Sequence, residues 1–304
     1  DHRDLHSFPT RRSSDLRMFI CVVLLVFGSS VYAIDFSNVW SCYSGNCGNF
    51  IVAANRTIAG NEKFCVPLNA GRASVAVFDG NGNAYYCTEY HYDDPEQCVY
   101  LNSINQNNGV KNWQIRVGKT SSSMICLSPC TSPDGTVYVA TQINVLNAFR
   151  GKDGKRLWRF SPHTKTKGKV SCPVWMRGVV FVVMDDVCYA VNAKSGKLIW
   201  KKSAYDIIAI SDQYVFLATY KGTLAVNRNN GNVIWRNKDG FENFILNDDC
   251  IYVRSENILS SLNVYTGKVR WSTKLAEPFC QTPDKSKNLV INPKGELIGS
   301  IALA

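Results

Sequence analysis

The sequence predicts an all-β fold, a β-propeller built from four-stranded blades, and three observations lead to it. Five segments place a glycine four residues before a tryptophan, and they include five of the seven tryptophans. Short runs rich in β-branched and aromatic residues precede these pairs, as in residues 136–141 and 179–184. Beyond residue 33 no stretch keeps a 3.6-residue apolar period, which argues against helices.

The glycine–tryptophan segment recurs with a period that marks a repeat architecture. Successive glycines lie 45, 42, 35 and 36 residues apart. Each glycine follows a small polar residue, which suits a turn with positive φ between the third and fourth strands of a blade. A tryptophan on the fourth strand can bury a large area against a neighbouring blade, so we interpret these pairs as structural. The pairs are Gly109 and Trp113, Gly154 and Trp158, Gly196 and Trp200, Gly231 and Trp235, and Gly267 and Trp271.

Three further positions recur before each glycine. A small residue stands six positions before it and an apolar residue five positions before it. The position four before it holds Asn105, Asn192, Asn227 and Asn263, with Arg150 as the exception. Since closure into a ring leaves short sheets without exposed edges, four strands per period favour a propeller over an open sheet.

The repeats give five complete blades and part of a sixth. The blades are expected at about 73–117, 126–160, 171–202, 204–237 and 241–274, and the sixth begins at Pro278. It stops before any further Gly-x-x-x-Trp, which suggests a truncated propeller of seven or eight blades. The alternative is a six-bladed ring completed by a strand at Asp35–Tyr43.

The first 33 residues are interpreted as two segments that do not belong to the fold. Residues 1–17 are expected to be non-native, because DHRDLHSFPTRRSSDL can be back-translated into a common sequencing adapter and precedes Met18. Residues 18–33 resemble a signal peptide, with an apolar core at Phe19–Phe27 and small residues before the cleavage site. A buried N-terminal strand is the alternative. Residues 34–72 then lead into the propeller at 73–304, and the protein is expected to be secreted or lumenal in the secretory pathway.

The cysteines support an oxidising compartment. Eleven of the twelve lie beyond the signal segment, a density typical of disulfide-containing secreted proteins. Cys87 and Cys98 flank one loop on strands that should pair, so we predict a disulfide between them. Asn55 begins the single N-glycosylation sequon. Without a Cys-x-x-Cys pair and with few histidines, no metal site is predicted.

The repeat resembles the tryptophan-docking motif of the PQQ-like, or quinoprotein, repeat family, Ala-x-Asp-x-x-Thr-Gly-x-x-x-Trp. Cys188–Trp200 and Ser261–Trp271 are the clearest examples, and the resemblance covers roughly residues 73–301. The Asp of the family motif is absent at all five repeats, and its Thr remains only as Thr266. The adjacent cysteines that the family's dehydrogenases use beside their cofactor are also absent.

The resemblance implies a secreted, non-catalytic binding or scaffold module, and the alternative is a PQQ-dependent oxidoreductase. We predict no catalytic residue and no cofactor. The partner is expected to be an unknown protein or glycan. Nucleic acid is not expected, because no nucleic-acid motif is present. Stable membrane insertion is not expected either, since the nine apolar residues of Phe19–Phe27 are too few to span a bilayer as a helix.

Overall fold

The computed structural model describes nine stretches of the chain, and every regular element in them is a β-strand. No helix in these stretches is long and apolar enough to cross a membrane. The all-β prediction is therefore confirmed. The predicted segments 1–17 and 18–33, most of 34–72 and Asn55 lie outside the described residues. The described residues are 72–89, 98–119, 127–162, 169–239, 243–247, 249–255, 258–274, 287–291 and 297–302.

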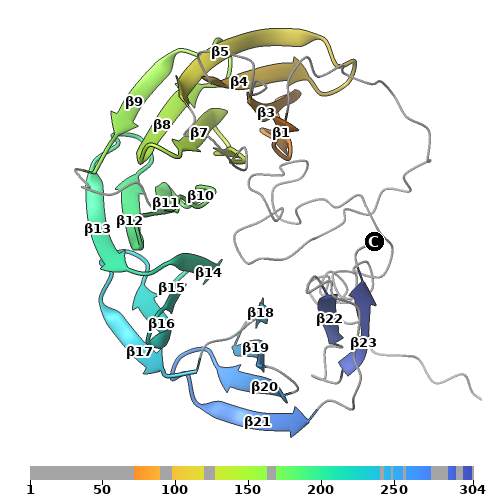
Figure 1. Ribbon diagram of the computed structural model, residues 1–304, viewed down its shortest axis with the longest axis vertical. Coiled ribbons are helices and arrows are strands. Elements are labelled where there is room, and N and C mark those ends of the chain that lie inside the picture. The colour runs from red at the N-terminus through yellow and green to blue at the C-terminus, as the bar shows by residue number, and fades with distance from the viewer. Residues whose placement is uncertain are drawn as a thin grey trace, which may run out of the picture. The chain divides into compact units, whose positions relative to one another are not determined.

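The chain divides into two compact units, residues 31–277 and residues 1–30 with 278–304. The larger unit holds five antiparallel sheets that follow one another in chain order and correspond to the five predicted blades (Figure 1). In the smaller unit the described strands are β22 (Lys287–Ile291) and β23 (Leu297–Ala302), which form one hairpin. The partial sixth blade expected from Pro278 thus contributes two described strands.

Each sheet of the larger unit uses its strands in sequence order. The first sheet contains β1 (Arg72–Ala73), β2 (Val77–Phe78), β3 (Asn83–Glu89), β4 (Cys98–Asn105) and β5 (Lys111–Lys119). The second contains β6 (Cys130–Thr131), β7 (Thr136–Thr141), β8 (Val145–Arg150) and β9 (Arg156–Phe160). The third contains β10 (Val174–Met176), β11 (Val179–Met184), β12 (Val187–Asn192) and β13 (Leu198–Ser203). The fourth contains β14 (Asp206–Ile210), β15 (Tyr214–Thr219), β16 (Gly222–Asn227) and β17 (Val233–Asn237). The fifth contains β18 (Asn243–Asn247), β19 (Cys250–Ser255), β20 (Ile258–Asn263) and β21 (Val269–Lys274).

The first strand of the first sheet is split into β1 and β2, and both pair with β3. Ser74 lies at the break, where its backbone N–H donates to the Cys87 carbonyl at 2.9 Å. Its hydroxyl accepts the Cys87 N–H, also at 2.9 Å. Ser171 makes the same pair of bonds to Val183 at the start of the third sheet. A serine side chain thus takes the place of a missing ladder carbonyl, so the innermost strand can bend without leaving a buried donor unpaired.

The hydrophobic core lies between consecutive sheets. Four clusters of buried residues fill the four interfaces, and the second and third strands of neighbouring sheets supply most of their side chains. Because both faces of these strands are covered, their sequences are almost continuously apolar, as in β11 and β12. The fourth strands are more exposed.

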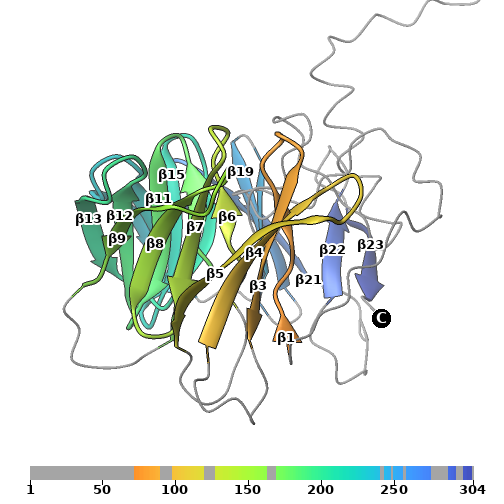
Figure 2. The ribbon, with the colours of Figure 1, turned by 90° about the horizontal axis from the view of Figure 1, so that it is seen from above.

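The turns gather at the two ends of the strands (Figure 2). The turns from third to fourth strand, which contain the repeat glycines, lie at one end, here called the glycine-turn end. The turns from second to third strand lie at the opposite end, together with the connections from one sheet to the next. Because strand direction alternates within each sheet, the same kind of turn lies at the same end throughout.

Candidate functional site

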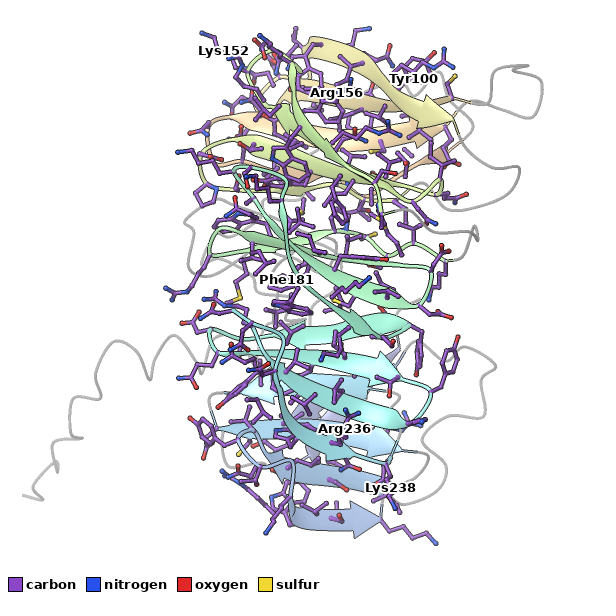
Figure 3. All side chains as sticks on the ribbon, turned by 90° about the vertical axis from the view of Figure 1, so that its left-hand side faces the viewer. Tyr100, Lys152, Arg156, Phe181, Arg236 and Lys238 are labelled. Atoms are coloured by element: carbon purple, nitrogen blue, oxygen red, sulfur yellow. The ribbon has the colours of Figure 1, made fainter. Side chains whose placement is uncertain are left out.

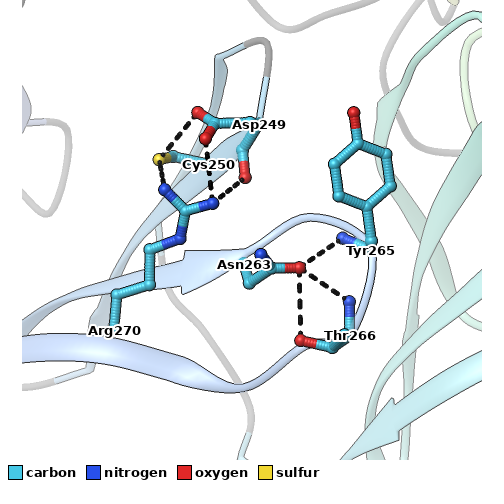
Figure 4. Close-up of polar contacts among 6 residues, drawn as sticks. All are labelled: Asp249, Cys250, Asn263, Tyr265, Thr266 and Arg270. Atoms are coloured by element: carbon cyan, nitrogen blue, oxygen red, sulfur yellow. Dashed lines mark hydrogen bonds and ion pairs between the residues drawn. The ribbon is translucent and has the colours of Figure 1, made fainter.

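The repeat glycines occupy the turns between third and fourth strands, with φ between 66° and 72°. Each glycine N–H donates to the carbonyl of the residue four positions earlier, at 2.8–2.9 Å. In the fifth sheet that residue is Asn263, whose side-chain Oδ1 also accepts the backbone N–H groups of Tyr265 and Thr266 (Figure 4). Asn192 and Asn227 make equivalent bonds in their sheets. The asparagine that replaces the family's aspartate therefore closes a turn by an Asx-type bond, for which an uncharged acceptor suffices.

The second sheet carries Arg150 at this position and closes its turn differently. The Asp153 carboxylate accepts the N–H of Lys155 at 3.1 Å and pairs with the Arg150 guanidinium. The hydrogen bond from Arg150 is the main reason that the pKa of Asp153 falls to about 2. The bond from the N–H after the glycine to the side chain before it also occurs in the other four sheets, at Asn108, Ser195, Asn230 and Thr266. The second sheet keeps this bond, and the Arg150–Asp153 salt bridge stands where the other sheets have the Asn side-chain bonds.

The first four repeat tryptophans each pack on the glycine turn of the sheet that follows. Trp113, Trp158, Trp200 and Trp235 donate their indole N–H to a backbone carbonyl of the next turn at 2.7–2.8 Å. A Cβ on the following glycine would lie 2.6–3.1 Å from the indole ring. Trp200 and Trp235 are only 7% exposed, and Trp158 is partly buried. The geometry is that of a docking contact between sheets.

The small residue of the repeat lies directly opposite the tryptophan. Ala190 pairs with Trp200 and Ala225 with Trp235, and the register shifts by one residue immediately after each pair. Ser103, Ala148 and Ser261 occupy the same place in the other three sheets. A larger side chain there would lie beside the indole, so the bulge and the small residue together let the ring reach the next sheet. The repeat in the sequence marks this position but does not indicate its role.

Cys87 and Cys98 do not meet across the first hairpin. The register pairs Cys87 with Leu101, three residues beyond Cys98 on β4. At about 3.3 Å per residue the offset along the strand is roughly 10 Å, more than a disulfide spans, and the two side chains point to opposite faces of the sheet. This register does not fit the predicted Cys87–Cys98 bridge.

The opposite end of the strands is where we place the candidate site. We define the loop face by Asn144, Asp185, Asp186, Tyr205 and Tyr220, which come from three consecutive sheets. Four non-glycine residues have positive φ in the described chain, and three of them, Asn144, Asp185 and Asp186, lie on this face. Asp185 and Asp186 fill the two central positions of the hairpin turn between β11 and β12, where positive φ is the ordinary geometry and Asp tolerates it. The case for this end therefore rests on the side chains that its turns present.

Side-chain hydrogen bonds connect the loop face from sheet to sheet. Asn144 Nδ2 donates to Asp185 Oδ2 at 2.7 Å, and the Tyr220 hydroxyl donates to Asp186 Oδ2 at 2.9 Å. The second bond raises the pKa of Tyr220. The Tyr205 and Tyr220 rings lie 5.2 Å apart, and Tyr220 is 80% exposed. An aromatic pair with one exposed ring beside carboxylate acceptors can stack on an apolar ring face and bind a hydroxyl or a cationic group.

A second polar cluster lies at the glycine-turn end of the fifth sheet (Figure 4). The Arg270 guanidinium donates to Asp249 Oδ2 at 2.9 Å and to the Cys250 sulfur at 3.0 Å. The Cys250 thiol donates to Asp249 Oδ1 at 3.1 Å. Burial, followed by the bond to Asp249, raises the pKa of Cys250. The thiol therefore stays protonated, and the cluster neutralises Arg270 internally.

Comparison with known proteins gives one family and two kinds of relative. The sequence model of the family described as outer membrane protein assembly factor BamB matches residues 99–243 and 220–299. Outer membrane protein assembly factor BamB of Legionella pneumophila is 32% identical over 120 residues, which are 33% of this chain and 31% of that protein. Quinoprotein ethanol dehydrogenase of Pseudomonas aeruginosa is 34% identical over 80 residues, 24% of this chain and 13% of that protein. The chain thus spans less than a third of the length of these curated relatives.

Two solved structures share the fold. BamB from Moraxella catarrhalis has a TM-score of 0.54 at 15% identity, and the matched part covers 73% of this chain and 71% of the BamB chain. A europium-containing methanol dehydrogenase has a TM-score of 0.57 at 12% identity, and the matched part covers 78% of this chain and 58% of the dehydrogenase chain. Both are β-propeller proteins, so the predicted propeller architecture is confirmed.

Proposed function

Since the chain belongs to the PQQ-like repeat family whose sequence model is described as outer membrane protein assembly factor BamB, we propose that it is a secreted, non-catalytic binding or scaffold module. The observation that carries this proposal is the docking of four consecutive repeat tryptophans onto the next glycine turn. These residues are engaged in holding the sheets together. Its partner would be a protein or a glycan.

The described residues do not fit the cofactor of the family's enzymes. PQQ is planar and anionic, so its site needs an aromatic face, cationic partners and a metal held by oxygen ligands. The described repeat tryptophans up to Trp235 present their rings to a neighbouring turn instead. Among the described residues no group of three or more His, Cys, Asp or Glu could hold a metal ion. We therefore derive no chemical step through PQQ.

The loop face supports the binding role. Its turns differ in composition from sheet to sheet, with Asp185–Asp186 in the third sheet and Tyr220–Lys221 in the fourth, and the turn of the second sheet, 142–144, is one residue longer. Tyr220 is exposed, and its hydroxyl is already oriented by Asp186. A ligand that covers this tyrosine would bury apolar area without having to order a mobile hydroxyl first.

The first experiment tests the absence of catalysis. The full chain is titrated with PQQ in the presence of Ca²⁺, and dye reduction is followed with a panel of alcohols and sugars. We expect neither saturable PQQ binding nor turnover. Micromolar binding with turnover would instead establish the oxidoreductase alternative, which the partial match to quinoprotein ethanol dehydrogenase keeps in view.

The second experiment tests the loop face. Tyr220→Ala is compared with Tyr265→Ala on panels of glycans and secreted proteins. Tyr265 is the matched control, because it is also exposed, at 50%, but lies at the glycine-turn end. A ligand of the loop face should lose binding with the first variant and keep it with the second. Equal effects would place the binding site elsewhere.

A further inference from the structure

The fourth strands carry a one-sided charge. The five described fourth strands, β5, β9, β13, β17 and β21, hold ten Lys and Arg and no Asp or Glu. The whole chain carries 34 Lys and Arg against 24 Asp and Glu, so an average sample of ten charged residues would include several acidic ones. The positive charge is thus concentrated on the outermost strands.

Three consecutive sheets repeat an apolar–Trp–basic tripeptide on this strand. Residues i and i+2 of a strand share a face, so the apolar residue and the cation lie together, on the face opposite the docked tryptophan. Leu157, Ile199 and Ile234 are 48%, 41% and 42% exposed, and the three cations are exposed as well. We call these six residues the outer band: Leu157, Arg159, Ile199, Lys201, Ile234 and Arg236.

The cations of the outer band are available to a ligand. Among the described residues the salt bridges join Arg150 with Asp153, Arg177 with Asp212, and Arg270 with Asp249, so none uses an outer-band residue. The flanking sheets serve as internal contrasts. The first has Asn112 and Gln114 around its tryptophan, and the fifth has Arg270, which Asp249 neutralises.

The arrangement favours one class of polyanion. The strands β9, β13 and β17 follow one another along the outer side of the larger unit (Figure 1), and Figure 3 looks onto this side, with Arg156 and Arg236 labelled. To contact all three strands, a ligand must bend from one sheet to the next. A flexible linear chain can do so, whereas a DNA duplex, with a persistence length of about 50 nm, resists bending over so short a distance. Single-stranded nucleic acid needs exposed aromatic platforms, and the tryptophans here are docked.

We propose that the outer band binds a linear anionic polysaccharide. Arg159, Lys201 and Arg236 would pair with its sulfate or carboxylate groups, and the three aliphatic side chains would contact the apolar faces of its sugar rings. The proposal rests on the proposed binding function and names a partner class for a second surface, separate from the loop face. It involves no covalent step.

The test uses heparin as the probe and the full chain as the protein. The variant Arg159→Gln/Lys201→Gln/Arg236→Gln is compared with Lys152→Gln/Lys194→Gln/Lys268→Gln, which removes the same charge from exposed residues of the glycine turns. We expect at least about a tenfold loss of heparin affinity in the first variant and less than about twofold in the second, because charge-assisted contacts are local. Circular dichroism and the thermal midpoint confirm that both variants are folded.

Three results would overturn the proposal: no heparin binding, equal losses in the two variants, or equally tight binding of a 24-base-pair DNA or of phosphatidylserine vesicles. A third variant, Leu157→Ser/Ile199→Ser/Ile234→Ser, tests the apolar half of the band and should weaken heparin binding with all charges kept. The PQQ dye-reduction assay is run on the same preparation. Turnover there contradicts the proposed function whatever heparin does, while failed heparin binding without turnover rejects the outer band alone.

Discussion

The turns at the two ends of the strands differ in how closely they repeat from sheet to sheet. At the glycine-turn end, five turns repeat one backbone hydrogen bond, from the glycine N–H to the residue four positions earlier. The described turns at the opposite end do not repeat this bond. The second sheet has a three-residue turn that ends with Asn144, and the third and fourth sheets have two-residue turns that carry an Asp pair and Tyr220. Repetition therefore marks the end that holds the sheets together, and variation marks the end that is free to recognise a ligand.

The largest expected effect is at the docking contact. Trp235→Ala removes a ring that is 7% exposed and is bonded to the Val264 carbonyl, so we expect a loss of about 3–5 kcal/mol in the free energy of unfolding. Urea denaturation measures it, with Tyr220→Ala as the control at the other end. A loss below about 1 kcal/mol would show that the docking contact does not hold these sheets together.

The glycine under that ring should be the next most sensitive position. A Cβ at Gly267 would lie 2.6 Å from the Trp235 ring, and φ there is 66°, so Gly267→Ala combines an overpacking cost of about 1–3 kcal/mol with a conformational cost of about 1–2 kcal/mol. Gly178→Ala is the control, because φ is 80° but no atom lies within 4 Å of the added Cβ. Equal losses of unfolding free energy in the two variants would mean that packing against the Trp235 ring contributes nothing to the cost.

Variants of Asn192 test which atoms of the turn asparagine stabilise the turn, since this residue stands where the family motif has Asp. Asn192→Ala should cost about 1 kcal/mol, since it deletes the acceptor for the N–H groups of Lys194 and Ser195. Asn192→Asp keeps the acceptor and should be nearly neutral. Thermal unfolding of the two variants beside the wild type decides the matter, and a large loss for Asn192→Asp would mean that the amide N–H groups, not the oxygen, are needed.

The smallest effect is expected on the loop face. Tyr220→Phe should lower the thermal midpoint at neutral pH only slightly, because the ring is exposed and water competes for the bond to Asp186. The bond to Asp186 raises the pKa of Tyr220 above the ordinary value of 10, so its contribution is present below pH 10 and is lost as the pH rises through the folded-state pKa. Burial raises the pKa of other tyrosines as well, so Tyr220 is isolated as the difference between the spectrophotometric titration curves of the wild type and the variant. That difference should have its midpoint above pH 10, and a midpoint at or below pH 10 would argue against the bond.

The sequence was sufficient for the features that repeat. The glycine–tryptophan spacing predicted the all-β fold and located the third-to-fourth-strand turns, because a local turn and a nearby strand depend on short-range geometry. The spacing did not reveal that the first four repeat tryptophans dock forward, onto the following sheet, or why Ala190 is small. Both depend on a register shift that only the paired strands define.

The features that do not repeat were harder to predict. The spacing of Cys87 and Cys98 suggested a hairpin but could not fix the register across it, and a three-residue offset separates the two sulfurs. The loop face draws Asn144, Asp186 and Tyr220 from three sheets, and no local pattern brings such distant residues together. The exposed aromatic in a short turn was the one available signal for it.

The forward docking of the tryptophans has a spectroscopic consequence. The environment of each indole is completed by the sheet that follows, so the emission of Trp158 depends on whether the third sheet is in place, and that of Trp200 on the fourth. Local opening of one sheet would expose its predecessor's indole to water while its own remained covered. In variants that keep a single repeat tryptophan, the change in its fluorescence emission during unfolding would therefore report when the following sheet opens.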